Sequence, residues 1–141
     1  MSKKKLISLE ERFTGILWAI VAPVKEYQLC WNINKVLGFD LKRADDVELI
    51  NKKRNRTSVF SFFKSASDID KWQVFMMSNK HLGEFLIPEV KQADYFLIIR
   101  GEVSDSRESE LFAKLKGIQV IQLIVKLNFD QLKSKANLMV E

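Results

Sequence analysis

The sequence predicts an α+β fold of ferredoxin-like type, an α/β sandwich in which a mostly antiparallel sheet carries two helices on one face. Two observations predict it. Two segments of the chain alternate strand, helix and strand patterns, and a run typical of a hairpin lies between them. The other face of the sheet is expected to be open, or to be covered by the amino-terminal segment, a carboxy-terminal helix or a second subunit.

The first strand–helix pattern lies near the beginning of the chain. Residues 13–22 are rich in Ile, Trp and Val and predict a strand, which Pro23 ends. From residue 24 to 37 the apolar side chains recur at steps of three and four, the spacing of one helix face. Gly38 suits the left-handed residue that follows a helix end. Residues 39–50 are mixed and acidic, so they are expected to be irregular.

The middle of the chain predicts a hairpin. Residues 59–64 and 71–78 are two β-rich runs, and the polar connection 65–70 fits an antiparallel hairpin with a slightly long loop. Residues 82–87 are expected to form a short further strand. Pro88 lacks a backbone donor, so it ends that strand or leaves it at a sheet edge.

The second strand–helix–strand pattern begins at residues 94–100. Their continuous apolar run is typical of a central strand that is buried on both faces. Asp105 and Glu108 have the spacing of a capping box, which predicts the start of a helix. Gly117 predicts the end of the same helix.

The carboxy-terminal part predicts one more strand and one more helix. Residues 118–127 alternate apolar side chains as a strand does, and residues 129–136 are expected to form a short amphipathic helix with Asn128 as its cap. The chain has neither a repeat nor a linker of biased composition, so residues 1–141 are expected to form a single domain.

The residue types exclude several kinds of site. A chain of 141 residues with 47% hydrophobic and 29% charged residues is an ordinary folded protein, large enough for a core. The single Cys30 rules out an intramolecular disulfide and a cysteine cluster, and His81 is the only histidine. The five glycines are scattered, which excludes phosphate-binding loops of known pattern. The sequence therefore predicts no catalytic residues, no cofactor and no metal.

The beginning of the chain favours a cytoplasmic location. Lys3, Lys4 and Lys5 are followed by no long apolar stretch, and the apolar run 15–24 is about half of what spans a bilayer. One free thiol agrees with a reducing compartment. No membrane partner is expected.

The formal net charge of +5 is unevenly distributed. Residues 1–56 hold the whole excess, and residues 57–141 are balanced. Basic runs of this kind either stay solvated or contact phosphates. The excess lies chiefly in two runs, Lys3–Lys5 and the group Lys52, Lys53, Arg54 and Arg56. A nucleic-acid-binding protein would combine the second run with aromatic side chains that stack on bases from a sheet face, here Phe60, Phe62, Phe63 and Trp72.

One candidate site surrounds a proline. Pro88 restricts its own φ and biases the preceding residue to an extended shape, so Glu89 and Asp94 bracket a rigid turn into the apolar strand that begins at Tyr95. In a structural interpretation the two carboxylates anchor the turn by accepting backbone N–H bonds. In a functional interpretation they form a ligand-facing acidic pair at a sheet edge, and a small ligand is not excluded.

A second candidate lies on the predicted first helix. Trp31, Asn32 and Asn34 fall partly off its apolar stripe. A half-exposed tryptophan beside amide side chains is typical of a contact surface. The alternative places Trp31 in the seam between helix and sheet.

Residues 87–95, with the sequence IPEVKQADY, resemble the signature of the bacterial IPExxxVDY family, with Ala93 where the name has valine. Residues 29–38 are similar to that family's amino-terminal helix, and residues 132–138 to its tail. The resemblance implies a small bacterial cytoplasmic protein. The family is named for its motif, so the resemblance implies no catalytic residue.

Two classes of function follow. The first is a non-enzymatic domain that binds a partner protein or associates with itself as a homodimer through an open sheet face or an edge strand. The second is a nucleic-acid-binding accessory protein that uses the basic run and the sheet aromatics. A domain that binds a small regulatory molecule is a weaker third, because paired strand–helix–strand units are often used in that way.

Overall fold

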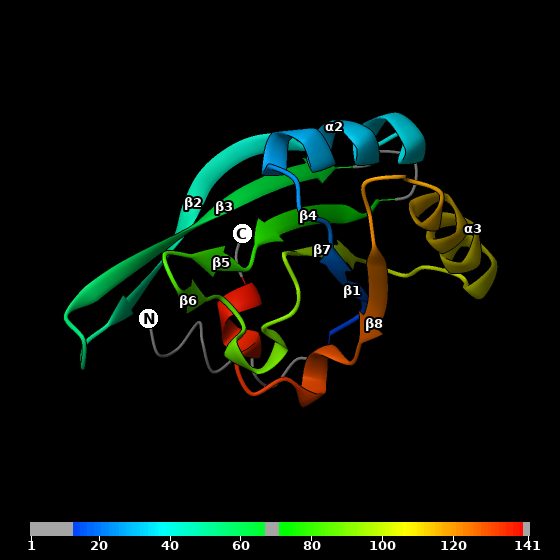
Figure 1. Ribbon diagram of the computed structural model, residues 1–141. Helices are drawn as coiled ribbons and strands as arrows, with labels where there is room; N and C mark the ends of the chain where they lie inside the picture. The colour runs from blue at the N-terminus through cyan, green and yellow to red at the C-terminus, as the bar shows by residue number, and fades with distance from the viewer. Residues whose placement is uncertain (1–12, 67–70, 140–141) are drawn as a thin grey trace.

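The computed structural model describes residues 13–66 and 71–139, and it has the predicted α+β architecture (Figure 1). A six-stranded sheet carries the fold, in the order β2-β3-β4-β7-β1-β8, and every neighbouring pair is antiparallel. Its strands are β1 (Gly15–Val21), β2 (Lys42–Asn51), β3 (Arg56–Ala66), β4 (Gln73–Ser78), β7 (Tyr95–Arg100) and β8 (Leu123–Leu127). The helices are α2 (Glu26–Leu37) and α3 (Asp105–Lys116).

The strand order confirms the ferredoxin-like prediction. Four of the strands, β8, β1, β7 and β4, follow one another in the order of that fold, with β1 between the two strands of the second unit. The hairpin of β2 and β3 is inserted between α2 and β4 and extends the same sheet on its far side. Strands β3 and β4 are the predicted hairpin pair.

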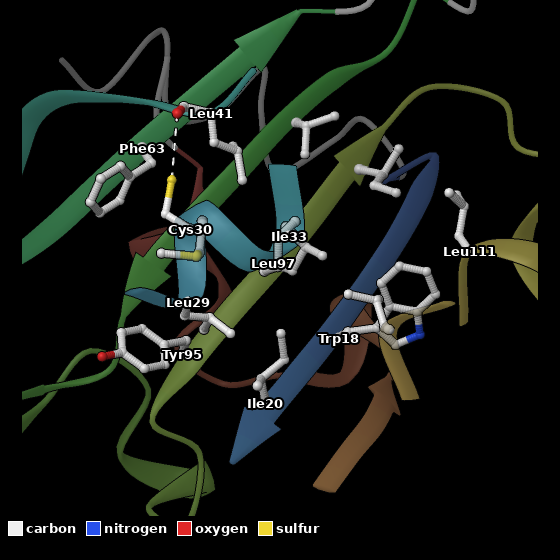
Figure 2. Packing of buried hydrophobic residues seen from close by; sticks show 14 of the residues in the cluster. Trp18, Ile20, Leu29, Cys30, Ile33, Leu41, Phe63, Tyr95, Leu97 and Leu111 are labelled. Atoms are coloured by element: carbon white, nitrogen blue, oxygen red, sulfur yellow. Dashed lines mark hydrogen bonds between the residues drawn. The ribbon is translucent and has the colours of Figure 1, made fainter. Parts of the chain in front are cut away.

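Both helices cover one face of the sheet. Strand β1 sends alternate side chains to opposite faces, so Trp18 and Ile20 point to the helices while Leu17 and Ala19 point away. Figure 2 shows this helix-side core, where Leu29 and other residues of α2 pack over the sheet, and where Leu111 of α3 approaches Trp18. The described core of this face also includes Cys30, Ile33, Phe63, Tyr95 and Leu97.

The opposite face is covered by the chain itself. Segment 86–93 and the carboxy-terminal segment pack on it, and among the described residues the cover contributes Leu86, Ile87, Ala93, Phe129 and Leu138. The predicted helix 129–136 is instead two 3-10 helices, η2 (Phe129–Gln131) and η3 (Lys135–Leu138). Asn128 caps the first of them as predicted, because its side chain accepts from the Asp130 amide at 3.1 Å. The predicted cover by residues 1–12 lies outside the described part of the chain.

The prediction of an irregular segment 39–50 is wrong. Strand β2 pairs along the whole outer side of β3, but a bulge shifts the register between Ala44 and Val47. The extra residue breaks the two-residue alternation by which a strand is recognised in a sequence. Only one face of this edge strand is partly buried, at Val47 and its neighbours. The exposed positions can therefore hold charged residues such as Asp45 and Glu48.

Three further boundaries differ from the predictions. The cap of α3 is Ser104 rather than Asp105, since the Ser104 hydroxyl accepts from the Arg107 amide at 3.2 Å. The last strand begins at Leu123, five residues later than predicted. The expected strand 82–87 contributes only β6 (Glu84–Phe85), which pairs with β5 (Lys80–His81) in a separate small sheet, and the 3-10 helix η1 (Pro88–Val90) follows.

Candidate functional site

The segment that carries the nine-residue motif is tied to the sheet by Asn79, a fully buried residue directly after β4. The Asn79 amide donates to the Asp94 carbonyl at 2.9 Å, and the Asn79 carbonyl accepts from the Leu86 amide at 2.9 Å. Residues 80–93 leave the sheet after β4 and return to it before β7. These two hydrogen bonds hold the two ends of that segment together.

The side chain of Asn79 fixes the interior of the same excursion. Its Oδ1 accepts from the Ile87 amide at 2.8 Å, while its Nδ2 donates to the carbonyls of Val90 and Ala93 at 2.8 and 2.9 Å. A buried amide that satisfies three backbone groups specifies one loop conformation. Asn79 was not recognised from the sequence, because an asparagine after a strand is usually a solvated turn residue.

Asp94 joins the end of β1 to the start of β7. Its Oδ2 accepts from the Ala22 amide at 2.9 Å and its Oδ1 forms an ion pair with Lys80 Nζ at 2.8 Å. The backbone amide of Asp94 donates to the Ile20 carbonyl at 2.8 Å. These are the contacts of an anchoring carboxylate, as the structural interpretation expects.

Tyr95 reaches in the opposite direction, toward α2. Its ring is buried in the helix-side core (Figure 2). Its hydroxyl donates to the Val24 carbonyl in the connection between β1 and α2. Burial raises the pKa of Tyr95 to about 12, and the nearby charges of Glu26 and Asp94 act in the same direction. The phenol therefore stays protonated and remains a donor.

Glu89 does not share a site with Asp94. Its carboxylate accepts from both the amide and the hydroxyl of Ser134, at 2.8 and 2.9 Å. Burial alone would raise the pKa of Glu89, but these hydrogen bonds outweigh it and leave the pKa below its ordinary value. Glu89 thus fastens η1 to the carboxy-terminal segment, whereas Asp94 contacts β1 and β5. The structure does not bring the two together as an acidic pair.

A polar cleft of about 740 Å³ lies between the start of α2 and strands β3 to β5, and Asp94 and Tyr95 line it. Three of its other polar side chains, all on the strand side, are held within the chain. Lys80 is paired with Asp94, the Ser78 hydroxyl accepts from the Ser61 amide at 2.8 Å, and His81 Nδ1 accepts from the Val59 amide at 3.1 Å. The strand side of the cleft is therefore a hydrogen-bonded seam.

The candidate residues on α2 separate into three environments. Asn34 clamps the loop to β2, since its side chain accepts from the Leu41 amide at 2.8 Å and donates to the Leu41 carbonyl at 3.1 Å. Asn32 donates to a carbonyl one turn earlier in the helix. Trp31 is 60% exposed on the outer face, 4.8 Å from Lys35 Nζ to the ring centroid, so its predicted alternative place in the helix–sheet seam is wrong.

The basic run Lys52, Lys53, Arg54 and Arg56 is exposed at the turn between β2 and β3. The aromatic residues that were expected to cooperate with it are buried in the two cores: Phe60, Phe62, Phe63 and Trp72. The prediction that they offer a stacking surface on an open sheet face is therefore wrong. Each ring packs inside one of the two cores, because both faces of the sheet are covered.

Cys30 is buried on α2. Its thiol donates to the Leu41 carbonyl at 3.4 Å, and burial raises its pKa (Figure 2). Within residues 13–66 and 71–139, no three His, Cys, Asp or Glu side chains are grouped so as to hold a metal ion. The described helices are also too short or too polar to cross a membrane.

The two edges of the sheet differ sharply. Edge strand β2 carries charges along its length and a bulge, two features that discourage strand addition. Edge strand β8 pairs with β1 on one side and with no described residue on the other. Four of its five residues are apolar, and its side chains Leu123 and Val125 are 53% and 43% exposed. Sequence periodicity places both residues on a strand, but it carries no signal that this strand forms an edge.

Comparison of the chain with protein-family models, with curated proteins and with solved structures finds no significant match.

Proposed function

We propose that this chain is a non-enzymatic protein-interaction domain that associates with a second copy of itself through strand β8. One observation carries the proposal: edge strand β8 is apolar except for Lys126, while β2 at the other edge carries five charged residues and a bulge. An open edge presents unpaired backbone groups to a strand of another chain. Proteins that remain monomeric usually block such an edge, as β2 is blocked here.

The side chains of β8 suit antiparallel pairing with the same strand. When two copies meet about a two-fold axis through Val125, Leu123 lies opposite Leu127 of the second copy, and Ile124 lies opposite Lys126 of the second copy. Like charges therefore do not face each other directly. Lys126 is moreover paired with Glu108 of α3 at 2.7 Å, so its charge is compensated within each copy.

The interface should be modest in size. Two strands of five residues bury less than the roughly 1,600 Å² of a standard interface. We therefore expect dissociation in the micromolar range and a monomer–dimer equilibrium that responds to dilution. Backbone pairing would join two six-stranded sheets into one continuous sheet across the axis.

The absence of catalysis is part of the proposal. The reactive side chains of the described part are engaged in the fold, which supports this. Asp94, Glu89, His81 and Cys30 each form a hydrogen bond to another part of the chain. We propose further that the chain is a bacterial cytoplasmic member of the IPExxxVDY family, on the strength of residues 87–95 and of a single buried thiol.

Sedimentation equilibrium over a concentration series tests the proposal. The wild-type chain should populate a dimer as its concentration rises. Val125→Lys should remain a monomer, because it places two like charges opposite each other at the axis. Ile50→Lys, which adds the same charge at an exposed site on edge strand β2, is the matched control and should dimerise as the wild type does. A wild-type chain that stays monomeric at every soluble concentration would contradict the proposal.

A further inference from the structure

A basic turn forms the tip of the hairpin of β2 and β3. Residues 52–55 connect Asn51 and Arg56, which pair across the hairpin, and the sequence from 51 to 56 contains no apolar residue. The hairpin reaches past the small sheet of β5 and β6 and away from both helices (Figure 1). We infer that this tip binds duplex nucleic acid through the phosphate backbone.

A carboxylate of the neighbouring small sheet contacts two arginines of the tip. Glu84 of β6 lies 3.0 Å from Arg54 Nη1 and 3.9 Å from Arg56 Nη1. One carboxylate thus holds two guanidinium groups on the same side of the hairpin, and it offsets only part of their charge. With Lys52 and Lys53 the tip presents four cations against this one carboxylate, a compact positive surface that attracts polyanions.

A groove of about 540 Å³ continues from the tip toward the body of the protein. Its lining combines the polar side chains of Asn51, Lys52, Lys53 and Ser58 with the carboxylate of Glu84 and with apolar residues, among them Leu49, Ile50 and Phe85. Of these residues, Asn51, Lys52, Lys53 and Ser58 are of the types that contact phosphates in protein–DNA complexes. A two-stranded ribbon also fits the major groove, which is about 12 Å wide.

Burial of the sheet aromatics decides which nucleic acid the tip suits. Proteins that bind single strands stack bases on exposed aromatic rings. Here Phe60, Phe62 and Phe63 are buried, so the hairpin offers charge and hydrogen-bond donors without a stacking surface. That combination matches a duplex, whose bases stay stacked and whose phosphates lie outside.

An anionic membrane is the competing partner, because Leu82 is exposed at the turn of the adjacent small sheet. The composition of the basic tip favours the duplex. A loop that enters a lipid interface carries its apolar residues at the point of contact, and the tip itself is entirely polar from Asn51 to Arg56.

Fluorescence anisotropy with a labelled DNA duplex of mixed sequence tests the inference, with the single strand of the same length in parallel. The wild-type chain should bind the duplex at low salt and should prefer it to the single strand. The affinity should fall as salt rises, because bound phosphates release counterions. In the triple variant Lys52→Gln, Lys53→Gln and Arg54→Gln the slope of log affinity against log salt should fall by about 0.9 for each phosphate that the variant no longer neutralises.

The matched control removes the same charge from the helices, with Lys35→Gln, Lys114→Gln and Lys116→Gln, and should keep the wild-type slope. Three results would overturn the inference. They are a preference for the single strand, an equal loss in the control variant, and binding to vesicles containing phosphatidylserine that is abolished by Leu82→Ser while the duplex is ignored. Because Val125→Lys lies at the opposite edge of the sheet, duplex binding by that variant separates this inference from the proposed dimer.

Discussion

The carboxylate of Asp94 accepts a hydrogen bond from the backbone amide of Ala22 at 2.9 Å, across 72 positions of sequence. This bond links the residue just before β7 to the residue just after β1, and these two strands are neighbours inside the sheet. The same carboxylate holds Lys80 at 2.8 Å. The motif segment 87–95 therefore stabilises the fold through Asp94, which links its strands.

Asp94→Ala should destabilise the protein by about 1.5–3 kcal/mol, because it leaves the Ala22 amide unpaired and removes a charge-assisted bond. Chemical denaturation should show a lower midpoint with an unchanged slope. Asp94→Asn keeps an acceptor for the Ala22 amide and should lose less. A wild-type midpoint for Asp94→Ala would show that the contact contributes nothing to stability.

Glu89→Gln should have a pH-dependent effect. The pKa of Glu89 is lowered in the folded state, so its ionised form contributes stability above the ordinary value of 4.5, and this contribution is lost as pH falls through the lower folded value. The stability difference between wild type and variant should thus be present at neutral pH and vanish in acid. The side chain is exposed, so the effect stays below about 1 kcal/mol. A difference that grows in acid would contradict this account.

Asn79→Ala should be the most destabilising substitution in this region. It leaves the Ile87 amide and the Val90 and Ala93 carbonyls without their partner, at a cost of about 1–3 kcal/mol for each buried group that stays unpaired. Amide hydrogen exchange should accelerate from residue 86 to 94. Asn79→Asp retains the acceptor but turns an oxygen toward two carbonyls, so it should rescue little. Rescue to wild-type stability would show that the two donated bonds are dispensable.

Tyr95→Phe should cost about 1 kcal/mol for the lost bond to the Val24 carbonyl. The pKa of Tyr95 is raised from 10.0 to about 12, so its contribution is complete below pH 10 and is lost as pH rises through 12. An alkaline absorbance titration of wild type minus Tyr95→Phe should therefore show a step near 12. A step near 10 would mean that the ring is not buried as described.

The parts of the fold that repeat a regular pattern could be predicted from the sequence. The helix before Gly38 has an uninterrupted helical periodicity and residues 95–99 form an uninterrupted apolar run, and both elements occur where predicted. Strand β2 was missed because its bulge interrupts the alternation. The partners of the motif could not be predicted either, since Ser134 is 45 residues from Glu89 and only the folded chain brings them together.

Disulfide trapping at position 125 tests the central proposal most directly. In a Cys30→Ala background, Val125→Cys places two thiols opposite each other at the proposed axis, where facing Cβ atoms of antiparallel strands lie about 4.5–5.5 Å apart. Mild oxidation should convert this variant into a covalent dimer, while Ile50→Cys on the other edge strand should stay monomeric under the same conditions. Failure of Val125→Cys to cross-link at concentrations well above micromolar, or equal cross-linking by Ile50→Cys, would contradict association through β8.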